Sequence, residues 1–394
     1  MKKIKIGIMG AWRGGSFAQI YLNEYFDDVE IVAICESSKE KIEHAVNELK
    51  LPPNIKYFDD FDEFIDCGID AVILCNFFHE HAKYAIKALN KGIHVMSETT
   101  AAPTLAECVE LCEAVESSGA KYMLGVNCAY FYSTLELARI YNEGLLGRVL
   151  YADGEYFHPY DPTIVISGSN DPHHWRKFLP RTYYNMHDLA PLMSITGTVP
   201  KKVNAKTIFA PDLTSKNNVG DVAAIILTEM DNGAVFRTTA AASLSPIGKW
   251  FRVVCENGTI ETGRHDINQV TCEFNPWIKP DGVETIRTYD VCPEGTPDEV
   301  RNSGHGNSDQ VLCKVFIDYI NDKIHPFFDV YKSVALSATA ILAWYSVLND
   351  GKEFTIPDFT DKQEREKYKN DRRTPFPDKD GNGITLPCSS KPCR

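Results

Sequence analysis

The first 36 residues place a glycine-rich turn between two apolar segments, and the second segment ends on an acid. Residues 3–9 (KIKIGIM) favour a short buried strand, and residues 16–26 have the apolar periodicity of a helix. Residues 30–35 (EIVAIC) favour a second strand, and Glu36 follows it directly. A chain that alternates strand, helix and strand builds a parallel sheet, because parallel neighbours need a crossover connection.

The turn between the two segments predicts a dinucleotide-binding site. Gly10, Gly14 and Gly15 lie there, and the backbone N–H groups of a glycine turn can approach a pyrophosphate closely. The N-terminus of the following helix adds a positive dipole. An acid about 20 residues further along binds the adenosine ribose hydroxyls and repels a 2′-phosphate, so Glu36 predicts NAD rather than NADP. The open alternative is an ordinary strand–helix turn whose glycines only permit close packing.

Trp12 and Arg13 are unusual residues for this turn. Trp12 stands where a second glycine is common, and Arg13 follows it. The Trp12 backbone can still follow the turn, but its side chain must point away from the pyrophosphate. We include both residues in the predicted cofactor site.

The composition excludes several classes of protein. The 394 residues are enough for two domains, and the apolar content of 44% supports ordinary cores. A formal net charge of −13, without a basic cluster that carries aromatic residues, argues against nucleic-acid binding. No apolar run has the length of a membrane span, and the run at the N-terminus is too short and too glycine-rich for a signal peptide. Twelve scattered cysteines without a CxxC motif indicate buried thiols, so we expect a cytoplasmic protein.

Strand and helix segments keep alternating up to residue 126. The expected helices span residues 39–49, 62–67, 79–91 and 105–117, and the further expected strands span residues 71–75, 93–96 and 121–126. This alternation predicts an α/β fold with a parallel, doubly wound sheet. We therefore assign residues 1–126 to an NAD-binding Rossmann domain.

The pattern changes to long strands after residue 127. Their expected ranges are 148–157, 202–209, 219–230, 234–243, 251–255, 259–263 and 270–274. The Asn-Gly pairs at residues 232–233 and 257–258 are hairpin turn signals between consecutive strands. Consecutive hairpins predict a large, mainly antiparallel sheet and an α+β organisation for this part of the chain.

Helices accompany the expected second sheet. One is expected at residues 133–143, and two more, at residues 309–321 and 330–348, are expected to cover one face of the sheet. We assign residues 127–360 to a domain that binds the substrate. Residues 361–394 are charged and rich in proline and glycine, which is typical of a tail or of a strap across the surface.

Residues 92–103 (GIHVMSETTAAP), with Asn76 and His81 before them, resemble the Gfo/Idh/MocA oxidoreductases, and the resemblance covers essentially the whole chain. The resemblance implies an NAD-binding domain followed by an open-faced α/β domain, whose sheet usually assembles dimers or tetramers. It also implies the following cofactor-binding residues: Asn76, His81, Glu98 and Asn127.

The usual Glu-Lys-Pro signature of this family is replaced here by Glu98-Thr99-Thr100. In sugar dehydrogenases of the family, that lysine lies beside the nicotinamide and hydrogen-bonds the hydroxyl being oxidised. Thr99 cannot take up a proton at neutral pH. Either other residues supply the base, or the protein is not a conventional dehydrogenase; a degenerate, inactive relative is a further alternative.

Two polar stretches make up the candidate substrate site. One is residues 156–158 (YFH), at the end of an expected strand, and the other is residues 183–191 (YYNMHDLAP), at the start of an expected helix. Tyr184 and His187 are three residues apart, so they share one face if the turn is helical.

Both stretches are similar to a branch of the family, the NAD-dependent retaining α-N-acetylgalactosaminidases, which also lacks the lysine. That branch has Tyr-x-His on the strand and Tyr-x-x-His-x-x-x-Pro on the helix, and this chain matches both patterns. Trp175 and Arg176 extend the similarity and are expected to bind the substrate. Val126 departs from it, because the branch has a glutamate at that position.

The similarity implies a self-recycling redox reaction. Bound NAD oxidises one sugar hydroxyl to a ketone, the neighbouring C–H becomes acidic, the group at C1 is eliminated, water adds back, and NADH reduces the ketone. We assign His187 to the oxidised hydroxyl, Tyr156 and Tyr184 to proton transfer, and His158 to substrate positioning or to departure of the leaving group.

The expected function is therefore redox-assisted processing of a glycoside. Two alternatives stay open: an ordinary NAD-dependent sugar or polyol dehydrogenase with His187 as its base, and a non-catalytic sugar or nucleotide sensor. The expected partners are a carbohydrate or glycoside substrate and further copies of the chain.

The remaining polar residues suggest smaller roles. Asp161, His173 and His174 lack a standard metal-ligand spacing, and we expect no metal. His305 and Asp309 precede an expected helix, so they either cap it or reach the substrate pocket.

Overall fold

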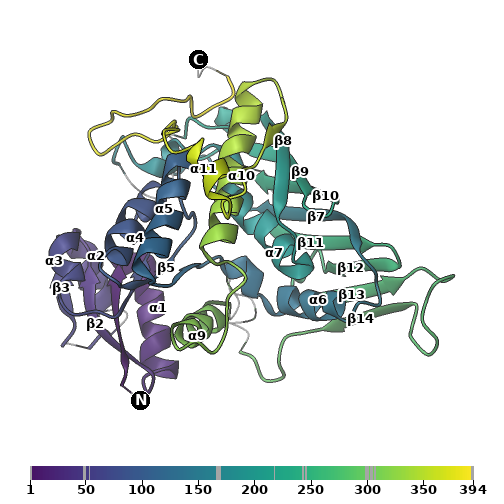
Figure 1. The fold of residues 1–394 in the computed structure, drawn as a ribbon, viewed down its shortest axis with the longest axis horizontal. Coiled ribbons are helices and arrows are strands. Elements are labelled where there is room, and N and C mark those ends of the chain that lie inside the picture. The colour runs from purple at the N-terminus through teal and green to yellow at the C-terminus, as the bar shows by residue number, and fades with distance from the viewer. Residues whose placement is uncertain are drawn as a thin grey trace. The chain divides into compact units, whose positions relative to one another are not determined.

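The structure is a computed structural model that describes residues 2–47, 50–52, 54–165, 170–216, 218–241, 244, 246–297, 301, 305 and 308–391. The chain divides into two compact units, drawn as a ribbon in Figure 1. The first unit comprises Met1–Gly125, Asp309–Val334 and Phe359–Arg372, and the second comprises Val126–Ser308, Ala335–Asp358 and Arg373–Arg394. Each unit is thus assembled from segments that are far apart in the sequence.

The first unit is built on a six-stranded parallel sheet in the order β3-β2-β1-β4-β5-β6. Its strands are β1 (Ile4–Met9), β2 (Val29–Cys35), β3 (Lys56–Phe58), β4 (Ala71–Leu74), β5 (His94–Ser97) and β6 (Tyr122–Leu124). The strand order reverses between β1 and β4, and in such sheets the carboxyl ends of these two strands border the ligand crevice. The predicted doubly wound sheet is confirmed.

Helices lie between the strands of the first unit, and most of them begin and end close to the expected positions; the start of α1 and the short helix α11 were not expected. They are α1 (Ala11–Glu24), α2 (Lys39–Asn47), α3 (Phe61–Ile65), α4 (His81–Leu89), α5 (Leu105–Ser118), α9 (Ser308–Ile320) and α11 (Lys362–Glu366), with a 3₁₀ turn, η1 (Phe78–Glu80), before α4. A longer helix, α10 (Val330–Leu348), contributes its first turn to this unit and the rest to the second.

The glycine turn is tighter than the sequence suggested. Helix α1 begins directly after Gly10, not at residue 16, so Gly14 lies inside the helix. Gly10 has a φ of 94°, and a Cβ there would lie 2.6 Å from the carbonyl oxygen of Cys75. A Cβ on Gly14 would lie 2.3 Å from Cγ2 of Ile8. The glycines therefore let α1 pack directly against the sheet.

Helix α9 corrects one expectation, because it belongs to the first unit and was expected to accompany the second sheet. The hydroxyl of Tyr25 on α1 donates to the carbonyl oxygen of Gln310 at 3.1 Å. Nζ of Lys121 donates to the carbonyl oxygen of Tyr319 at 2.6 Å. The periodicity of the segment predicted a helix correctly, but it carries no information about which sheet the returning chain meets.

The second unit contains a nine-stranded sheet in the order β14-β13-β12-β11-β7-β10-β9-β8-β15. Its strands are β7 (Val149–Phe157), β8 (Pro200–Ile208), β9 (Ala223–Met230), β10 (Val235–Ala241), β11 (Gly248–Cys255), β12 (Gly258–Thr262), β13 (Gln269–Phe274), β14 (Ile286–Asp290) and β15 (Phe354–Thr355). Only β7 and β10 pair in parallel; the other neighbours are antiparallel. The mainly antiparallel sheet and its two Asn-Gly hairpins are confirmed; β14 and β15 were not expected.

Helices pack against this sheet. They are α6 (Tyr132–Asn142), α7 (Met186–Thr196) and most of α10, with the 3₁₀ turns η2 (Asn127–Tyr130), η4 (Trp175–Lys177), η5 (Arg181–Asn185) and η6 (Pro211–Leu213). Helix α6 packs on β12 and β13, and α7 packs on β7, β10 and β11. Helix α10 meets β8, where the hydroxyl of Ser346 accepts a hydrogen bond from the backbone N–H of Ala205 at 3.0 Å. The expected range of α10 is confirmed.

Helix α7 makes a very close backbone contact with β7. A Cβ built on Gly154 would lie 2.3 Å from the carbonyl oxygen of Asp188 on α7. Glycine is therefore required there by the approach of two main chains. This contact fixes the start of α7 beside the carboxyl-terminal end of β7.

The segment after residue 372 is a strap on the second unit. Nε1 of Trp344 donates to the carbonyl oxygen of Pro387 at 2.9 Å. The hydroxyl of Ser390 donates to Oδ1 of Asp221 at 3.0 Å. A Cβ on Gly381 would lie 2.5 Å from Nε2 of His173, so the strap also passes closely over the connection that follows β7.

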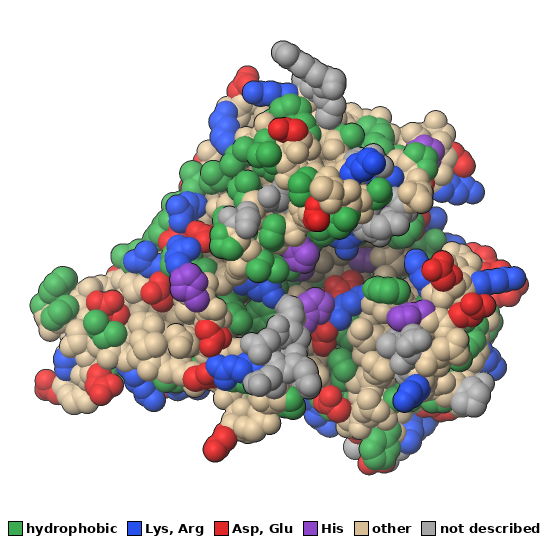
Figure 2. Space-filling model, turned by 180° about the vertical axis from the view of Figure 1, so that it is seen from behind, with side chains coloured by type: hydrophobic (Ala, Val, Ile, Leu, Met, Phe, Trp, Pro, Cys, Tyr) green, Lys and Arg blue, Asp and Glu red, His purple; other side chains and the backbone are tan. Residues whose placement is uncertain are grey.

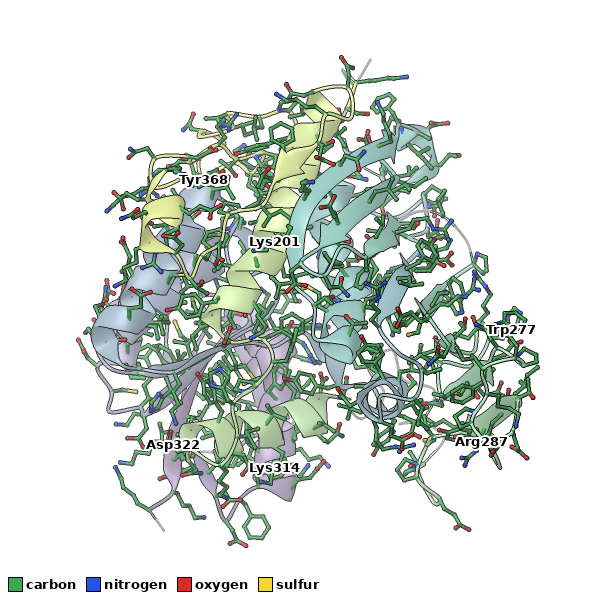
Figure 3. All side chains as sticks on the ribbon, turned by 45° about the vertical axis from the view of Figure 1, so that its right-hand side comes forward. Lys201, Trp277, Arg287, Lys314, Asp322 and Tyr368 are labelled. Atoms are coloured by element: carbon green, nitrogen blue, oxygen red, sulfur yellow. The ribbon has the colours of Figure 1, made fainter. Side chains whose placement is uncertain are left out.

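The surface carries mixed charge, with acidic and basic side chains interspersed on the face shown in Figure 2. Trp277, in the connection from β13 to the edge strand β14, is 82% exposed (Figure 3). No helix within the described ranges is long and apolar enough to cross a membrane. The cysteines that the structure describes are all free thiols.

We expect Gly154→Ala to destabilise the protein by about 2 kcal/mol, because the new methyl group must push α7 away from β7. Urea unfolding measures this change. Gly248→Ala, in β11 of the same sheet, is the matched control, since a Cβ there meets nothing within 4 Å. Equal stability of the two variants would show that the α7–β7 contact is not as tight as described.

Candidate cofactor and substrate sites

The first candidate site lies at the carboxyl ends of β1 and β2, where α1 begins. Gly10 is the N-cap residue of α1, and as a glycine it has no side chain with which to cap the helix. Glu36 follows β2, and its carboxylate accepts hydrogen bonds from the backbone N–H groups of Ala11 at 3.1 Å and Ser38 at 3.0 Å. The acid predicted to bind a ribose is therefore held next to the helix N-terminus predicted to bind a pyrophosphate.

The Trp12 side chain is directed toward α2. Its indole stacks on the imidazole of His44, with ring centroids 4.7 Å apart, and is 65% exposed. The bulky residue in the turn thus packs on a neighbouring helix, which leaves the turn backbone available to a ligand.

Arg13 joins three elements of the first unit through two carboxylates. Its Nε donates to Oε1 of Glu98 at 2.7 Å, and its Nη1 and Nη2 donate to the carboxylate of Asp309 at 2.6 and 2.8 Å. Burial alone lowers the pKa of the Arg13 guanidinium, but the two carboxylates raise it overall. This ion-pair network ties α1 to the end of β5 and to α9. Contact of Arg13 or Glu98 with a cofactor remains a prediction.

His81 joins the loops that follow β4 and β5. Its Nδ1 lies 3.1 Å from the carbonyl oxygen of Thr100, and its Nε2 lies 3.2 Å from that of Asn76. Burial lowers the pKa of His81 below its ordinary value, so the ring is neutral at pH 7 and donates to one carbonyl at a time. Oδ1 of Asn76 is buried without a hydrogen-bond partner among the described residues, so it is available to a donor from a ligand.

The predicted cofactor residues therefore gather at one edge of the first sheet, except for Asn127, which lies in η2 of the second unit. The glycine turn, the N-terminus of α1, Glu36 and the unpartnered Asn76 oxygen fit a nicotinamide dinucleotide. Within the described ranges, no group of three histidine, cysteine or acidic residues is placed to hold a metal ion.

The second candidate site is a cluster of four aromatic rings in the second unit, here called the ring cluster: Tyr156, His158, Tyr184 and His187. Tyr156 lies at the centre. Its ring centroid is 4.6 Å from that of His187, 5.7 Å from that of Tyr184 and 6.2 Å from that of His158. The end of β7 and the start of α7 thus bring together all four residues that the sequence selected.

Arg176 lies beside the ring cluster. Its guanidinium stacks over the Trp175 ring at 4.5 Å, and its Nη1 donates to the hydroxyl of Tyr160 at 3.4 Å. The Tyr160 ring in turn lies 5.0 Å from that of His158. Tyr160 was not selected from the sequence, although it lies only two residues beyond the Tyr-x-His pattern.

Burial and nearby positive charge keep the two imidazoles of the ring cluster uncharged, and burial keeps the Tyr156 phenol protonated. Burial, with the charges of His305 and Lys249, lowers the pKa of His187 to about 3. Burial also lowers the pKa of His158 and raises that of Tyr156 well above 10.0. At neutral pH the two imidazoles are therefore proton acceptors in their free-base form, and the Tyr156 phenol keeps its proton.

Sequence analysis missed two further neighbours of the cluster. Lys249 on β11 pairs in register with Tyr156, and its Nζ lies 5.7 Å from the Tyr156 ring. Sγ of Cys128 lies 3.7 Å from Nδ1 of His187. His305, which the sequence predicted either to cap a helix or to reach the substrate pocket, also lies near enough to lower the pKa of His187. Strand alternation alone could not reveal Lys249, because it does not show which strands become neighbours.

The chain matches two family descriptions. Residues 4–126 match the oxidoreductase family with the NAD-binding Rossmann fold, and residues 200–367 match the C-terminal domain of glycosyl hydrolase 109. The resemblance to Gfo/Idh/MocA proteins, the fold and the NAD cofactor are thereby confirmed.

Individual relatives and structures agree with these matches. The chain is 28% identical over 204 residues to glycosyl hydrolase family 109 protein 2 of Phocaeicola vulgatus, and the alignment spans 48% of this chain and 48% of that protein. It is 22% identical to an alpha-N-acetylgalactosaminidase of Tannerella forsythia, across 91% of this chain and 85% of the relative. A levoglucosan dehydrogenase in complex with NADH and L-sorbose shares the fold, with a TM-score of 0.73 at 18% identity, over 91% of this chain and 100% of that one.

We expect Glu36→Ala to weaken NAD binding by about 10-fold or more, because the ribose hydroxyls lose a charged acceptor. Isothermal titration calorimetry with NAD and NADP measures the change, and the preference for NAD should shrink. Glu40→Ala, an exposed acid on α2, is the control and should bind NAD normally. An unchanged affinity in Glu36→Ala would rule out the ribose contact.

We expect His187 to make the protein acid-sensitive. Its folded pKa of about 3 lies below the ordinary 6.5, so between these values the unfolded chain binds a proton that the folded protein does not. The wild type should therefore lose about 1 kcal/mol more stability than His187→Gln when the pH falls from about 8 to about 5.5. Urea unfolding at both pH values tests this. Identical losses would contradict it, and the exposed His265→Gln should behave like the wild type.

Proposed function

The chain joins a Gfo/Idh/MocA-type NAD-binding Rossmann domain to a C-terminal domain of the glycosyl hydrolase 109 kind, and from that premise we propose that it processes glycosides by transient oxidation of a sugar hydroxyl. One observation carries the proposal. Two phenols and two imidazoles, with neighbouring ring centroids 4.6–6.2 Å apart, converge in the unit that contains most of the hydrolase-like region. That combination supplies the acids and bases that elimination from an oxidised sugar needs.

NAD, when bound, takes a hydride from the carbon that carries the hydroxyl and returns it at the end of the reaction. His187 binds the hydroxyl through Nε2, because its Nδ1 faces Sγ of Cys128. With a pKa of about 3, the imidazole orients and passes a proton but does not hold it at neutral pH.

The two phenols transfer the protons of the elimination: one donates a proton to the departing oxygen, and the other removes the proton from carbon. The Tyr156 phenol is protonated in the unliganded site, because burial raises its pKa, and so it is suited to donating a proton to a departing oxygen. Tyr184, whose ring contacts both Tyr156 and His187, is the candidate for the C–H proton because of its position.

His158, Arg176 and Trp175 bind the sugar. Nδ1 of His158 is buried without a hydrogen-bond partner among the described residues, so a substrate hydroxyl there would satisfy it. The Arg176 guanidinium, held between the Trp175 ring and the Tyr160 hydroxyl, presents its donors in a fixed plane. The relative named alpha-N-acetylgalactosaminidase supports a glycoside as the substrate.

A second candidate function is ordinary NAD-dependent oxidation of a sugar or polyol. It is favoured by structural neighbours described as a levoglucosan dehydrogenase and as a myo-inositol 2-dehydrogenase from Lactobacillus plantarum, with TM-scores of 0.73 and 0.65. These likenesses, at 18% and 19% identity, concern the fold.

We further propose that the protein is a cytoplasmic homo-oligomer that assembles through the second sheet. Ile225 and Leu227 on β9 and Val235 on β10 are each 42% exposed. They leave apolar surface on the outer face of the sheet, which a second copy would cover.

The purified protein, without added nicotinamide, should release the aglycone from an aryl glycoside without accumulating NADH at 340 nm. Tyr184→Phe and His187→Ala should each lower that release by about 100-fold, because each removes a proton-transfer group. The matched controls are Tyr289→Phe on the edge strand β14 and the exposed His265→Ala, which should retain full activity.

Other outcomes would support the competing functions. NADH that accumulates only with added NAD and a free sugar would establish an ordinary dehydrogenase. Binding of a sugar without turnover, unchanged in His187→Ala, would establish a sensor.

A further inference from the structure

Lys249 lies against the ring cluster, yet the reaction above gives it no part. It stands on β11 directly opposite Tyr156 of β7 in the antiparallel register. Its Nζ is 5.7 Å from the centroid of the Tyr156 ring and 4.8 Å from that of Phe131. Because Nζ lies over two aromatic rings, the amine of Lys249 is held at the cluster instead of extending into water.

Compared with a lysine in water, the surroundings of this amine make its neutral form easier to reach. Burial lowers the pKa of Lys249 below the ordinary 10.5. In return, its positive charge contributes to the lowered pKa of His158 and of His187. The titratable and charged groups around it come from several elements: Cys128 of η2, Tyr156 of β7, His158 directly after β7, Arg176 of η4, His187 of α7, and His305.

Oxidation of an alcohol requires a group that keeps the hydroxyl proton. The hydride and the proton leave the same H–C–O–H unit, and the reverse step needs the proton back. His187, with a pKa of about 3, cannot keep it at neutral pH, and the Tyr156 phenol already carries its own. A half-buried primary amine suits this task, because burial makes its free base easier to form than that of a lysine in water, and its ammonium form can keep the proton until it is returned.

We propose that Lys249 is the proton acceptor for the substrate hydroxyl that is oxidised over the ring cluster. The inference rests on the proposed function. The O–H bond breaks and its electron pair forms the C=O bond as the hydride leaves for the nicotinamide of NAD. The proton forms a new N–H bond on Nζ. When the ketone is reduced again, the ammonium group returns that proton to the oxygen, so Lys249 ends each cycle unchanged.

Two substitutions separate this role from a simple need for positive charge. Lys249→Met keeps the length of the side chain without an amine, and Lys249→Arg keeps a charge that cannot be deprotonated. Both should lower kcat for aglycone release by about 100-fold with KM within about threefold of the wild type. Lys206→Met, an exposed lysine on β8 of the same sheet, should retain wild-type kcat. Addition of ethylamine should restore part of the activity to Lys249→Ala.

A readout without turnover tests the same residue in nicotinamide-free protein. Reductive ¹³C-dimethylation labels every lysine, and the Lys249 signal is the one absent from Lys249→Met. We expect this signal to titrate at a clearly lower pH than the Lys206 signal. Titration together with Lys206, or full kcat in Lys249→Arg, would overturn the role of Lys249 and leave the proposed function intact. A wild-type protein that neither releases an aglycone nor reduces NAD would overturn the function, and this inference with it.

Discussion

The close backbone contact between α7 and β7 is the constraint on which the candidate substrate site depends. At Gly154 the two main chains approach so closely that a Cβ would lie 2.3 Å from the carbonyl oxygen of Asp188. That approach places the start of α7 beside the end of β7, which brings His187 to 4.6 Å from Tyr156, measured between ring centroids. Asp188 itself is fully buried, and burial raises its pKa well above the ordinary value, because a charge there would be removed from water.

In the first unit, glycines likewise allow a helix to pack closely against strands, and here the packing positions the N-terminus of α1. Gly10 and Gly14 remove the side chains that would keep α1 away from the strands, and the helix N-terminus then points at the crevice. Hydrogen bonds and ion pairs hold the surrounding loops in place. His81 connects the loops after β4 and β5, and Arg13 connects α1 to Glu98 and Asp309. Packing and hydrogen bonds thus position the residues that we predict to bind the cofactor.

Charge state is what distinguishes the ring cluster from an ordinary aromatic core. A core of similar rings would need no cation nearby, whereas here Lys249, Arg176 and His305 surround two imidazoles and lower their pKa values. The site therefore offers free-base imidazoles and a protonated Tyr156 phenol at the same pH. Proton transfer between carbon and oxygen atoms of a sugar needs such groups together, and this is why the cluster supports an enzyme more strongly than its residues do singly.

The sequence by itself determined the elements and the local chemistry, because hydrophobic period, turn residues and short motifs act over a few neighbouring positions. It identified the strand–turn–helix of the first 36 residues, the Asn-Gly hairpins, α10, and the four rings of the cluster. Only the tertiary structure decided what joins across the chain: α9 with the first unit, Arg13 with Asp309, and Lys249 opposite Tyr156. Those pairings depend on which strands and helices pack together, and the free energy of that packing is shared over the whole fold, so no local pattern records it.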